Sequence, residues 1–360
     1  MKKSKDVLVI LSPAFPPKER GTEWVPAQQL LVKEIRSQFP GLAIVVISLF
    51  YPTQKTGYVW NDIRVIPFDG VNQKKLRRVL LWRNVWKRIN SIKKEKNVIG
   101  ILSFWCGECA LIGSWFAKLN HLRHYCWICG QDARETNKFV KWIRPKPDEL
   151  VAISDFLARE FFTNHQIKPA HVIPIAIDKK MFPELSGKRE FDIIGVGSFS
   201  FQKNYDQFVI VLAALKEKYP DLKAVHCGSG EDEENIKQMV KKLDLEQTLS
   251  LKGLLPHAEV IPLMQHAKIL LHPSSYEGFG LVHLEALYAG AHVISFTKAM
   301  NQPIKNWHVV NNQDEMIHKT IELFESNISY ERVLIYSIED TAKKIMDLFY
   351  LNFNKTNEDR

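Results

Sequence analysis

The sequence predicts an α/β protein with two doubly wound, parallel β-sheets. Short apolar strands alternate with amphipathic stretches of helix length along the 360 residues, which is typical of parallel sheets covered by helices on both faces. The strands fall into two series, separated by the polar, proline-containing residues 178–190. A hydrophobic content of 46% in a chain about twice the usual domain size also favours two globular domains.

The strand and helix candidates predict the domain boundaries. The first series of strands comprises Val7–Ser12, Ala43–Phe50, Arg64–Phe68, Val98–Phe104, Tyr125–Cys129, Leu150–Ser154 and His171–Ile177. The second comprises Phe191–Val196, Lys223–His226, Leu249–Lys252, Lys268–His272 and His292–Phe296. Helical patterns include Pro26–Gln38, Tyr205–Tyr219, Asp232–Leu243 and Leu281–Ala289. We expect Rossmann-like domains at 1–177 and 178–337, and a carboxy-terminal helix at 338–360 that packs back on the first domain. A ligand is expected in the cleft across which the two domains face each other.

Charge is distributed unevenly. Residues 1–180 hold 30 Lys and Arg against 15 Asp and Glu, whereas residues 181–360 hold 19 against 25. Residues 74–96 contain ten of the basic side chains, and apolar residues recur among them at a spacing of three and four, namely Val79, Trp82, Val85, Trp86, Ile89 and Ile92. Such a helix suits an anionic membrane surface or an anionic substrate. An ordinary amphipathic helix packed on the sheet is the alternative. Nucleic acid is not expected, because the spacing of a zinc finger, RRM or KH module does not occur.

No targeting segment is expected at the amino terminus. The apolar run Val7–Ser12 is too short for the core of a signal peptide, and no run approaches the roughly 20 residues that cross a bilayer. We expect a cytoplasmic protein, and the basic stretch makes the inner face of the membrane a further candidate location.

The cysteines form two pairs whose separation fits a zinc ribbon, Cys106 with Cys109 and Cys126 with Cys129. Cys126 and Cys129 lie in a predicted strand, so their side chains would point to opposite faces and could not share an ion. Buried, reduced thiols are the usual state in the cytoplasm. The other candidates for metal ligands lack ligand spacing, and we assign them to structure; they are His257, His272, His283 and His292. No metal is expected.

A glycine-bearing turn follows the predicted strand Lys268–His272. Its glycines, Gly278 and Gly280, allow the backbone to approach a ligand closely. The unpaired N–H groups at the start of the helix that follows favour phosphate or sugar oxygens. The turn therefore predicts a binding site for a phosphorylated or hydroxyl-rich ligand.

Two glutamates flank this turn. Glu285 follows Glu277 by eight residues, which corresponds to about 12 Å along a helix. Carboxylates so separated can each accept hydrogen bonds from hydroxyls at opposite ends of a long ligand such as a nucleotide-sugar. The separation exceeds the roughly 5–9.5 Å of a glycosidase's carboxylate pair, so hydrolysis by such a pair is disfavoured. The alternative is that neither glutamate has a functional role.

The same segment resembles the retaining glycosyltransferases of family 4, two-domain enzymes of the GT-B fold. The resemblance rests on Glu277-Gly-Phe-Gly-Leu-Val-His-Leu-Glu285-Ala, on Ala289-Gly290 and on the strand His292-Val-Ile-Ser. In such enzymes the first glutamate contacts the donor sugar, the second binds the ribose diol, and the amides between them meet sugar and phosphate. The resemblance implies these roles for Glu277 and Glu285, and for the turn residues Gly278, Phe279 and Gly280.

Weaker resemblances cover most of the second domain. The stretch from Gly195 to Asn204 looks like the family's Gly-Arg-Leu-x-x-x-Lys-Asn segment, in which Arg and Lys neutralise the diphosphate leaving group. Lys203 is present, whereas Ser198 stands at the arginine position and offers a hydrogen bond without a charge. Without the resemblance, Lys203 would be interpreted as a solvated lysine. The resemblance implies catalytic roles for Glu277 and Lys203, and donor contacts for Gly197, Ser198, Gly228 and Lys252.

In the first domain the resemblance is limited. Residues 20–23, which include Gly21, stand where family members usually carry a Gly-Gly pair. Residues 129–134 stand where many carry His-Gly-x-Asp, so that Cys129 replaces a histidine near the reaction centre. We expect an inert buried thiol rather than a nucleophile, because no histidine is adjacent in sequence. The resemblance implies an acceptor side formed by Gly21, Cys129, Asp132 and Arg134.

The resulting prediction is a retaining, metal-independent glycosyltransferase. It would move a sugar from a nucleoside diphosphate donor to a glycan or lipid-linked acceptor in surface polysaccharide or lipopolysaccharide synthesis. No cofactor beyond the donor substrate is expected, and an anionic membrane surface is a further candidate partner. Two alternatives stay open. One is a nucleotide-sugar epimerase of the same fold; the other is a non-catalytic sugar-nucleotide-binding partner, which the departures at Ser198 and Cys129 would suit.

Overall fold

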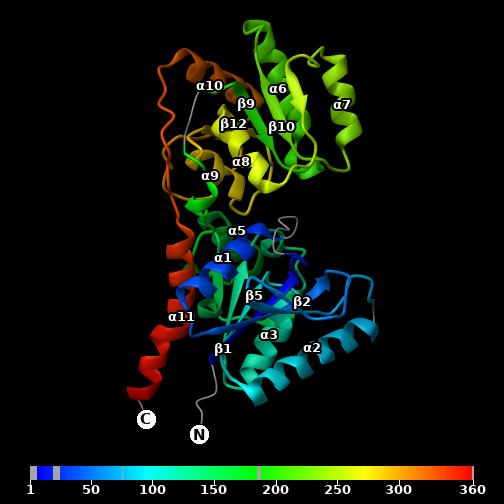
Figure 1. The fold of residues 1–360 in the computed structure, drawn as a ribbon, viewed down its shortest axis with the longest axis vertical. Coiled ribbons are helices and arrows are strands. Elements are labelled where there is room, and N and C mark those ends of the chain that lie inside the picture. Colours follow the sequence, from blue (N-terminus) through cyan, green and yellow to red (C-terminus); the bar gives the residue numbers. More distant parts are fainter. Residues whose placement is uncertain (1–5, 19–24, 75, 185–187, 359–360) are drawn as a thin grey trace. The chain divides into compact units, whose positions relative to one another are not determined.

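The chain divides into two compact units, each shown in Figure 1. The computed structural model describes residues 6–18, 25–74, 76–184 and 188–358, with side chains described as far as residue 350. Unit 1 comprises Met1–Ile175 and Ile338–Arg360, and unit 2 comprises Ala176–Ser337. The first division lies two residues before the predicted 177/178 boundary, and the second falls at the predicted 337/338 boundary.

Unit 1 is built on an eight-stranded sheet with the order β3-β4-β2-β1-β5-β6-β7-β8. Neighbouring strands are parallel except for β3 and β4. The strands are β1 (Asp6–Ala14), β2 (Ala43–Tyr51), β3 (Tyr58–Trp60), β4 (Ile63–Pro67), β5 (Asn97–Phe104), β6 (Arg123–Ile128), β7 (Leu150–Ala152) and β8 (His171–Val172). The helices are α1 (Pro26–Gln38), α2 (Leu76–Glu95), α3 (Glu108–Leu119), α4 (Phe139–Ile143), α5 (Asp155–His165) and α11 (Ile338–Glu358).

Helix α2 packs on the sheet through most of its predicted apolar stripe. Val85, Ile89 and Ile92 belong to one buried cluster with side chains of β1, β2 and α3, and Trp82 and Trp86 pack against it. Of the six predicted stripe residues, Val79 is the exposed one, at 54%. The alternative of an ordinary amphipathic helix is therefore confirmed for the stripe from Trp82 to Ile92, because burial against a sheet removes these residues from any membrane surface.

The carboxy-terminal helix α11 belongs to unit 1. The Tyr125 hydroxyl donates to Leu348 O at 2.8 Å, and the Arg123 guanidinium donates to Phe349 O. The Phe349 ring lies against Gly100 of β5, where an added Cβ would come within 2.5 Å of the ring. The helix thus lies against strands β5 and β6.

Unit 2 is built on a six-stranded parallel sheet with the order β11-β10-β9-β12-β13-β14. The strands are β9 (Phe191–Val196), β10 (Ala224–Cys227), β11 (Leu249–Leu251), β12 (Ala267–His272), β13 (His292–Ser295) and β14 (Trp307–Val309). The helices are α6 (Tyr205–Lys218), α7 (Glu233–Lys242), α8 (His257–Gln265), α9 (Leu281–Tyr288) and α10 (Gln313–Glu325). Buried side chains of α6, α7 and α10 form a core on one face of the sheet, and α8 and α9 pack against β12 and β13 (Figure 1).

Each sheet reverses its strand order once. In unit 2 the chain runs outward from β9 through β10 to β11 and then resumes beside β9 at β12. The corresponding reversal in unit 1 lies between β1 and β5. Loops that follow the two strands at such a reversal diverge and leave room for a ligand at the carboxyl edge of the sheet.

The predicted secondary structure differs from the observed one mainly at short or proline-containing strands. The predicted strand His171–Ile177 forms a ladder only at His171–Val172 and a single bridge from Ile177 to Ser337, since Pro174 has no N–H to donate to a ladder. Strands β3 and β14, three residues each, escaped prediction. The fold class is confirmed for both units: each is a doubly wound α/β unit. The predicted cleft between them stays a prediction.

Candidate functional site

The predicted donor site lies at the reversal of strand order in unit 2. Lys203 lies in the loop after β9, and Glu277 lies in the loop after β12. Hydrogen bonds join these loops, among them those from Asn204 Nδ2 to Pro273 O and from the Ser275 N–H to Gln202 O, both at 3.1 Å. The fold therefore brings two predicted catalytic residues together from positions 74 residues apart.

Glu277 is held through one carboxylate oxygen. Its Oε1 accepts hydrogen bonds from Lys203 Nζ and from His272 Nε2, the latter at 2.9 Å. Within the described ranges, Oε2 has no partner, and the side chain keeps 14% of its surface exposed. Burial by itself would raise the pKa of Glu277, but the hydrogen bond from His272 and the charge of Lys203 outweigh it and hold the pKa well below its usual range. Glu277 therefore offers a charged, unoccupied oxygen to a ligand.

Glu285 is also held through one carboxylate oxygen, by a histidine of helix α8. It lies on α9 with 7% of its side chain exposed, and its Oε1 bonds to His257 Nε2 at 2.7 Å. His257 begins α8. Burial would lower the pKa of His257, but the hydrogen bond and charge of Glu285 more than compensate and raise it. Among the described residues, Oε2 of Glu285 has no partner.

The glycines of the site are required by geometry. Gly280 precedes α9 with φ +81°, and a Cβ there would lie 2.5 Å from His283 Nδ1. Gly228 has φ +142°, and a Cβ there would lie 1.9 Å from Gly197 O. Both positions exclude other residues on conformational and steric grounds. Gly197 and Gly228 therefore lie side by side, on the loops after β9 and β10.

The remaining donor candidates contribute different groups. Ser198 is exposed on the loop after β9, so its hydroxyl is accessible. Lys252 follows β11, and its N–H is bonded to His226 O at 2.9 Å. The Phe279 side chain is 1% exposed, which leaves its backbone as the part that can meet a ligand. The structure thus places Ser198, Lys252 and Phe279 on loops that follow strands of one sheet, whereas Glu285 lies on helix α9.

Among the acceptor candidates in unit 1, Asp132 uses its carboxylate for hydrogen bonds within the unit. The buried Asp132 carboxylate accepts hydrogen bonds from the backbone N–H groups of Cys106, Cys129 and Gly130, at 2.8, 3.1 and 2.7 Å. Burial raises the pKa of Asp132, and these bonds offset only part of the effect. Arg134 is partly exposed just after the short helical turn Gln131–Ala133. Gly21 lies outside the described residues.

Cys129 is a protonated thiol. Its Sγ accepts a hydrogen bond from Gln28 Nε2 at 3.3 Å and donates one to Trp127 O at 3.2 Å. Burial and the neighbouring Asp132 carboxylate raise its pKa well above the usual value. This geometry suits the inert thiol of the prediction. No group of three or more His, Cys, Asp or Glu within the described ranges is arranged to hold a metal ion.

Two histidines that the sequence analysis assigned to structure each bond to one of the two glutamates, His272 to Glu277 and His257 to Glu285. His272 ends β12 and precedes Glu277 by five residues. His257 and Glu285 are 28 residues apart, and no local pattern connects them.

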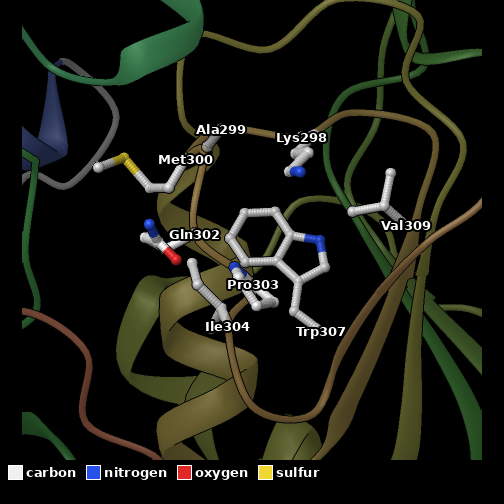
Figure 2. A pocket seen from close by; sticks show the side chains of 8 residues that line it. All are labelled: Lys298, Ala299, Met300, Gln302, Pro303, Ile304, Trp307 and Val309. Carbon is white, nitrogen blue, oxygen red and sulfur yellow. The ribbon is translucent and has the colours of Figure 1, made fainter.

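An apolar pocket adjoins the glycine turn. It has a volume of about 190 Å³, and Figure 2 shows the Trp307 indole among the side chains that line it. The Trp307 ring contacts Phe279 and His283, with centroids 6.0 and 4.5 Å apart, and its Nε1 donates to Ser295 Oγ at 2.8 Å. The Trp307 ring therefore lines the pocket and also contacts Phe279 of the turn. Because its N–H group is bonded to Ser295, the indole presents only apolar surface to the pocket.

Among the helices of the described ranges, none combines the length and the apolar character that crossing a bilayer requires.

Sequence comparisons point to one family for unit 2. Residues 176–340 match the model of "Glycosyl transferases group 1". A 2-deoxystreptamine N-acetyl-D-glucosaminyltransferase of Niallia circulans is 30% identical over 147 residues, 41% of this chain and 36% of that protein. The gpi3 subunit of the phosphatidylinositol N-acetylglucosaminyltransferase of Schizosaccharomyces pombe is 27% identical over 203 residues, 54% of this chain and 44% of that protein. The matches thus span between about a third and a half of the length of these curated relatives.

Solved structures match almost the whole chain. Sucrose-phosphate synthase of Thermosynechococcus elongatus aligns with a TM-score of 0.69 at 14% identity, over 99% of this chain and 98% of that one. HepE of Anabaena, solved with UDP and glucose, aligns with a TM-score of 0.66 at 15% identity, over 99% of each chain. At this identity the likeness establishes the fold. The chain therefore has the GT-B fold, and its second unit matches the group 1 glycosyl transferases.

Proposed function

We propose that the protein is a retaining, metal-independent glycosyltransferase. It would transfer a sugar from a nucleoside diphosphate donor to a glycan or lipid-linked acceptor in surface polysaccharide or lipopolysaccharide synthesis. The fold, the family match of unit 2 and the UDP present in related structures support a nucleotide-sugar as the donor. The retaining course rests on the resemblance of the Glu277–Glu285 segment to family 4.

One observation carries the proposal. Glu277 and Glu285 each have one oxygen held by a histidine and the other left without a partner among the described residues. Hydroxyls of a ligand can donate to such prepared, charged oxygens without displacing a protein donor. In the proposal, Glu277 binds the donor sugar and Glu285 binds the ribose diol.

The resemblance to family 4 implies a front-face displacement as the chemistry of transfer. The bond between the anomeric carbon and the phosphate oxygen breaks, the acceptor oxygen bonds to that carbon from the same face, and the leaving phosphate takes the acceptor's proton. Negative charge therefore grows on the diphosphate. Lys203 and the N–H groups at the start of α9 are the groups placed to stabilise it. Because Lys203 has three donors, it can keep its bond to Glu277 while it contacts a phosphate.

The acceptor is proposed to be anionic and bound to unit 1. A pocket of about 670 Å³ beside α2 is lined by Lys55, Arg77 and Arg88, and its lining includes no acidic side chain among the described residues of unit 1. Leu76, Val79 and Leu80 of the same helix are 81%, 54% and 52% exposed. Basic groups beside exposed apolar ones suit the headgroup of an anionic lipid at the inner face of a membrane. Co-sedimentation with anionic vesicles in preference to neutral ones, weakened by salt, is the expected result.

A thermal-shift panel of nucleotide-sugars tests the donor. A donor that binds the folded state raises Tm, and incubation with the selected donor should release free nucleoside diphosphate through transfer or slow hydrolysis. Binding without any turnover would instead favour the non-catalytic partner. A donor-soaked crystal with the ligand far from the glycine turn would overturn the assignment of the site.

A further inference from the structure

The buried side chain of His272 is placed to orient the carboxylate of Glu277. His272 is the last residue of β12 and has no exposed surface. Its Nε2 lies 2.9 Å from Glu277 Oε1 and 2.9 Å from Ser274 Oγ. A carboxylate only accepts hydrogen bonds, so the proton is on Nε2. Burial lowers the pKa of His272 even though Glu277 opposes the effect, and the ring is therefore a neutral donor.

The ring itself is fixed by packing. His283 meets it edge to face at 4.6 Å between centroids, and Tyr205 does so at 6.4 Å. His283 is anchored in turn by a contact of its Nδ1 with Phe279 O at 3.1 Å. His272 is thus packed between Tyr205 at the start of α6 and His283 of α9, and it cannot rotate without disturbing both.

Lys203 alone would not fix the carboxylate. Its side chain is 26% exposed and ends a flexible stem, and a diphosphate would compete for its charge. His272 stands at the end of a strand and beneath the surface, so a ligand cannot recruit it. Both donors act on Oε1, and the oxygen left for the ligand is Oε2.

We propose that His272 is a positioning residue that holds the Glu277 carboxylate with Oε2 directed at the donor sugar. It touches no substrate and acts through Glu277. This inference rests on the proposed function in one respect, namely that the ligand of Glu277 is a donor sugar. The hydrogen bond and the burial that carry it are independent of the ligand's identity.

Three variants test the proposal in the full-length protein. His272→Leu removes the donor and fills the space, whereas His272→Gln keeps an N–H group the same number of bonds from the backbone. His292→Leu makes the matched change at a buried histidine of neighbouring β13, whose partners are His308 and Ser329 O. The readouts are kcat and KM for the donor that the thermal-shift panel selects, the Kd of UDP, and Tm.

We expect His272→Leu to lower kcat roughly tenfold to a hundredfold, because a misplaced group costs rate rather than affinity. The Kd of UDP should stay within about twofold of the wild type, since Glu285 is untouched. His272→Gln should recover most of the rate, and His292→Leu should alter Tm alone. An unchanged kcat in His272→Leu, an equal loss in His292→Leu, or no recovery in His272→Gln would overturn the proposal. If His272→Leu does not fold, His272→Asn replaces it, because its shorter amide falls short of Glu277.

A second readout needs no turnover. A ¹³C NMR titration of the Glu277 carboxyl should show a higher pKa in His272→Leu than in the wild type, and a smaller rise in His272→Gln. An unchanged pKa in His272→Leu means that His272 does not hold Glu277, whatever the enzyme does. If the wild type binds and turns over no nucleotide-sugar, the proposed function fails, and this titration still decides the role of His272.

Discussion

The two units place a buried carboxylate near the same topological feature and use it in opposite ways. Glu277 in unit 2 follows a strand at the reversal of strand order, and Asp132 in unit 1 bonds to Cys106 in the loop after β5, a strand at the corresponding reversal. Glu277 keeps an oxygen without a partner among the described residues. Asp132 gives both oxygens to backbone N–H groups. One carboxylate is available to a ligand, and the other holds loops together.

The two carboxylates also differ in the direction in which their pKa values are shifted. The His272 hydrogen bond and cationic Lys203 keep the pKa of Glu277 low despite burial, whereas burial raises the pKa of Asp132, and hydrogen bonds from backbone N–H groups offset only part of that rise. A carboxylate that is buried, charged and incompletely bonded is costly to maintain unless a ligand uses it.

The largest expected effect is the loss of catalysis on changing Glu277 or Lys203. Glu277→Gln and Lys203→Met should each lower kcat by roughly 10²–10³, because each removes a charge placed at the reaction centre. Steady-state release of nucleoside diphosphate measures it. For Glu277→Gln the Kd of UDP should change little. A loss of UDP binding as large as the loss of rate would contradict the assigned role.

Asp132→Ala should act on stability instead. Three backbone N–H groups, one buried and two partly buried, lose their acceptor, and we expect the free energy of unfolding to fall by about 2–3 kcal/mol. Urea unfolding gives the stability, and calorimetry should find the wild-type affinity for UDP. If the variant kept full stability but lost transfer, Asp132 would belong to the site and the comparison of the two carboxylates would fail.

Glu285→Gln tests whether Glu277 and Glu285 have different roles in donor binding. A charged acceptor for the ribose diol becomes a neutral amide, and the affinity for UDP should fall about tenfold, or about 1.4 kcal/mol. Calorimetry with UDP alone isolates this effect from the sugar. Glu277→Gln is the matched variant, because it makes the same chemical change eight residues earlier. Identical losses of UDP affinity in both variants would refute the division of roles.

The smallest expected effect is a pH dependence of stability from His257. Glu285 raises the pKa of His257 in the folded state, so the folded protein holds this proton more tightly than the unfolded chain. The resulting stabilisation is complete below the unfolded value, about 6.5, and is lost as the pH rises through the folded value. The difference in unfolding free energy between the wild type and His257→Gln should therefore shrink by about 0.5 kcal/mol from pH 6 to pH 9. A constant difference would mean that the pair is not ionic.

Much of the site could be predicted from the sequence, because its residues follow strands. Glu277 and the turn glycines come directly after a buried apolar run, and in a parallel sheet the carboxyl ends of strands meet at one edge. The two histidines could not be assigned in this way. An imidazole carries no pattern that separates a packed ring from a hydrogen-bond donor, and the difference depends on which carboxylate the fold brings to it.

Helix α2 shows the same limit of prediction from sequence. Its spacing predicted a helix with one apolar stripe, and α2 has it. Spacing alone could not decide between a membrane surface and a sheet as the partner of that stripe. Packing decided it, since Val85, Ile89 and Ile92 are buried in the core of unit 1.

The sequence by itself determined the alternation of strands and helices, the two-unit organisation and the glutamates around a glycine turn, because periodicity and turn chemistry act over short stretches of chain. Only the tertiary structure decided the pairing of His272 with Glu277, the pairing of His257 with Glu285 and the structural use of Asp132. The physical reason is that a hydrogen bond depends on distances of about 3 Å between groups that the chain separates, and the order of strands in the sheet sets those distances.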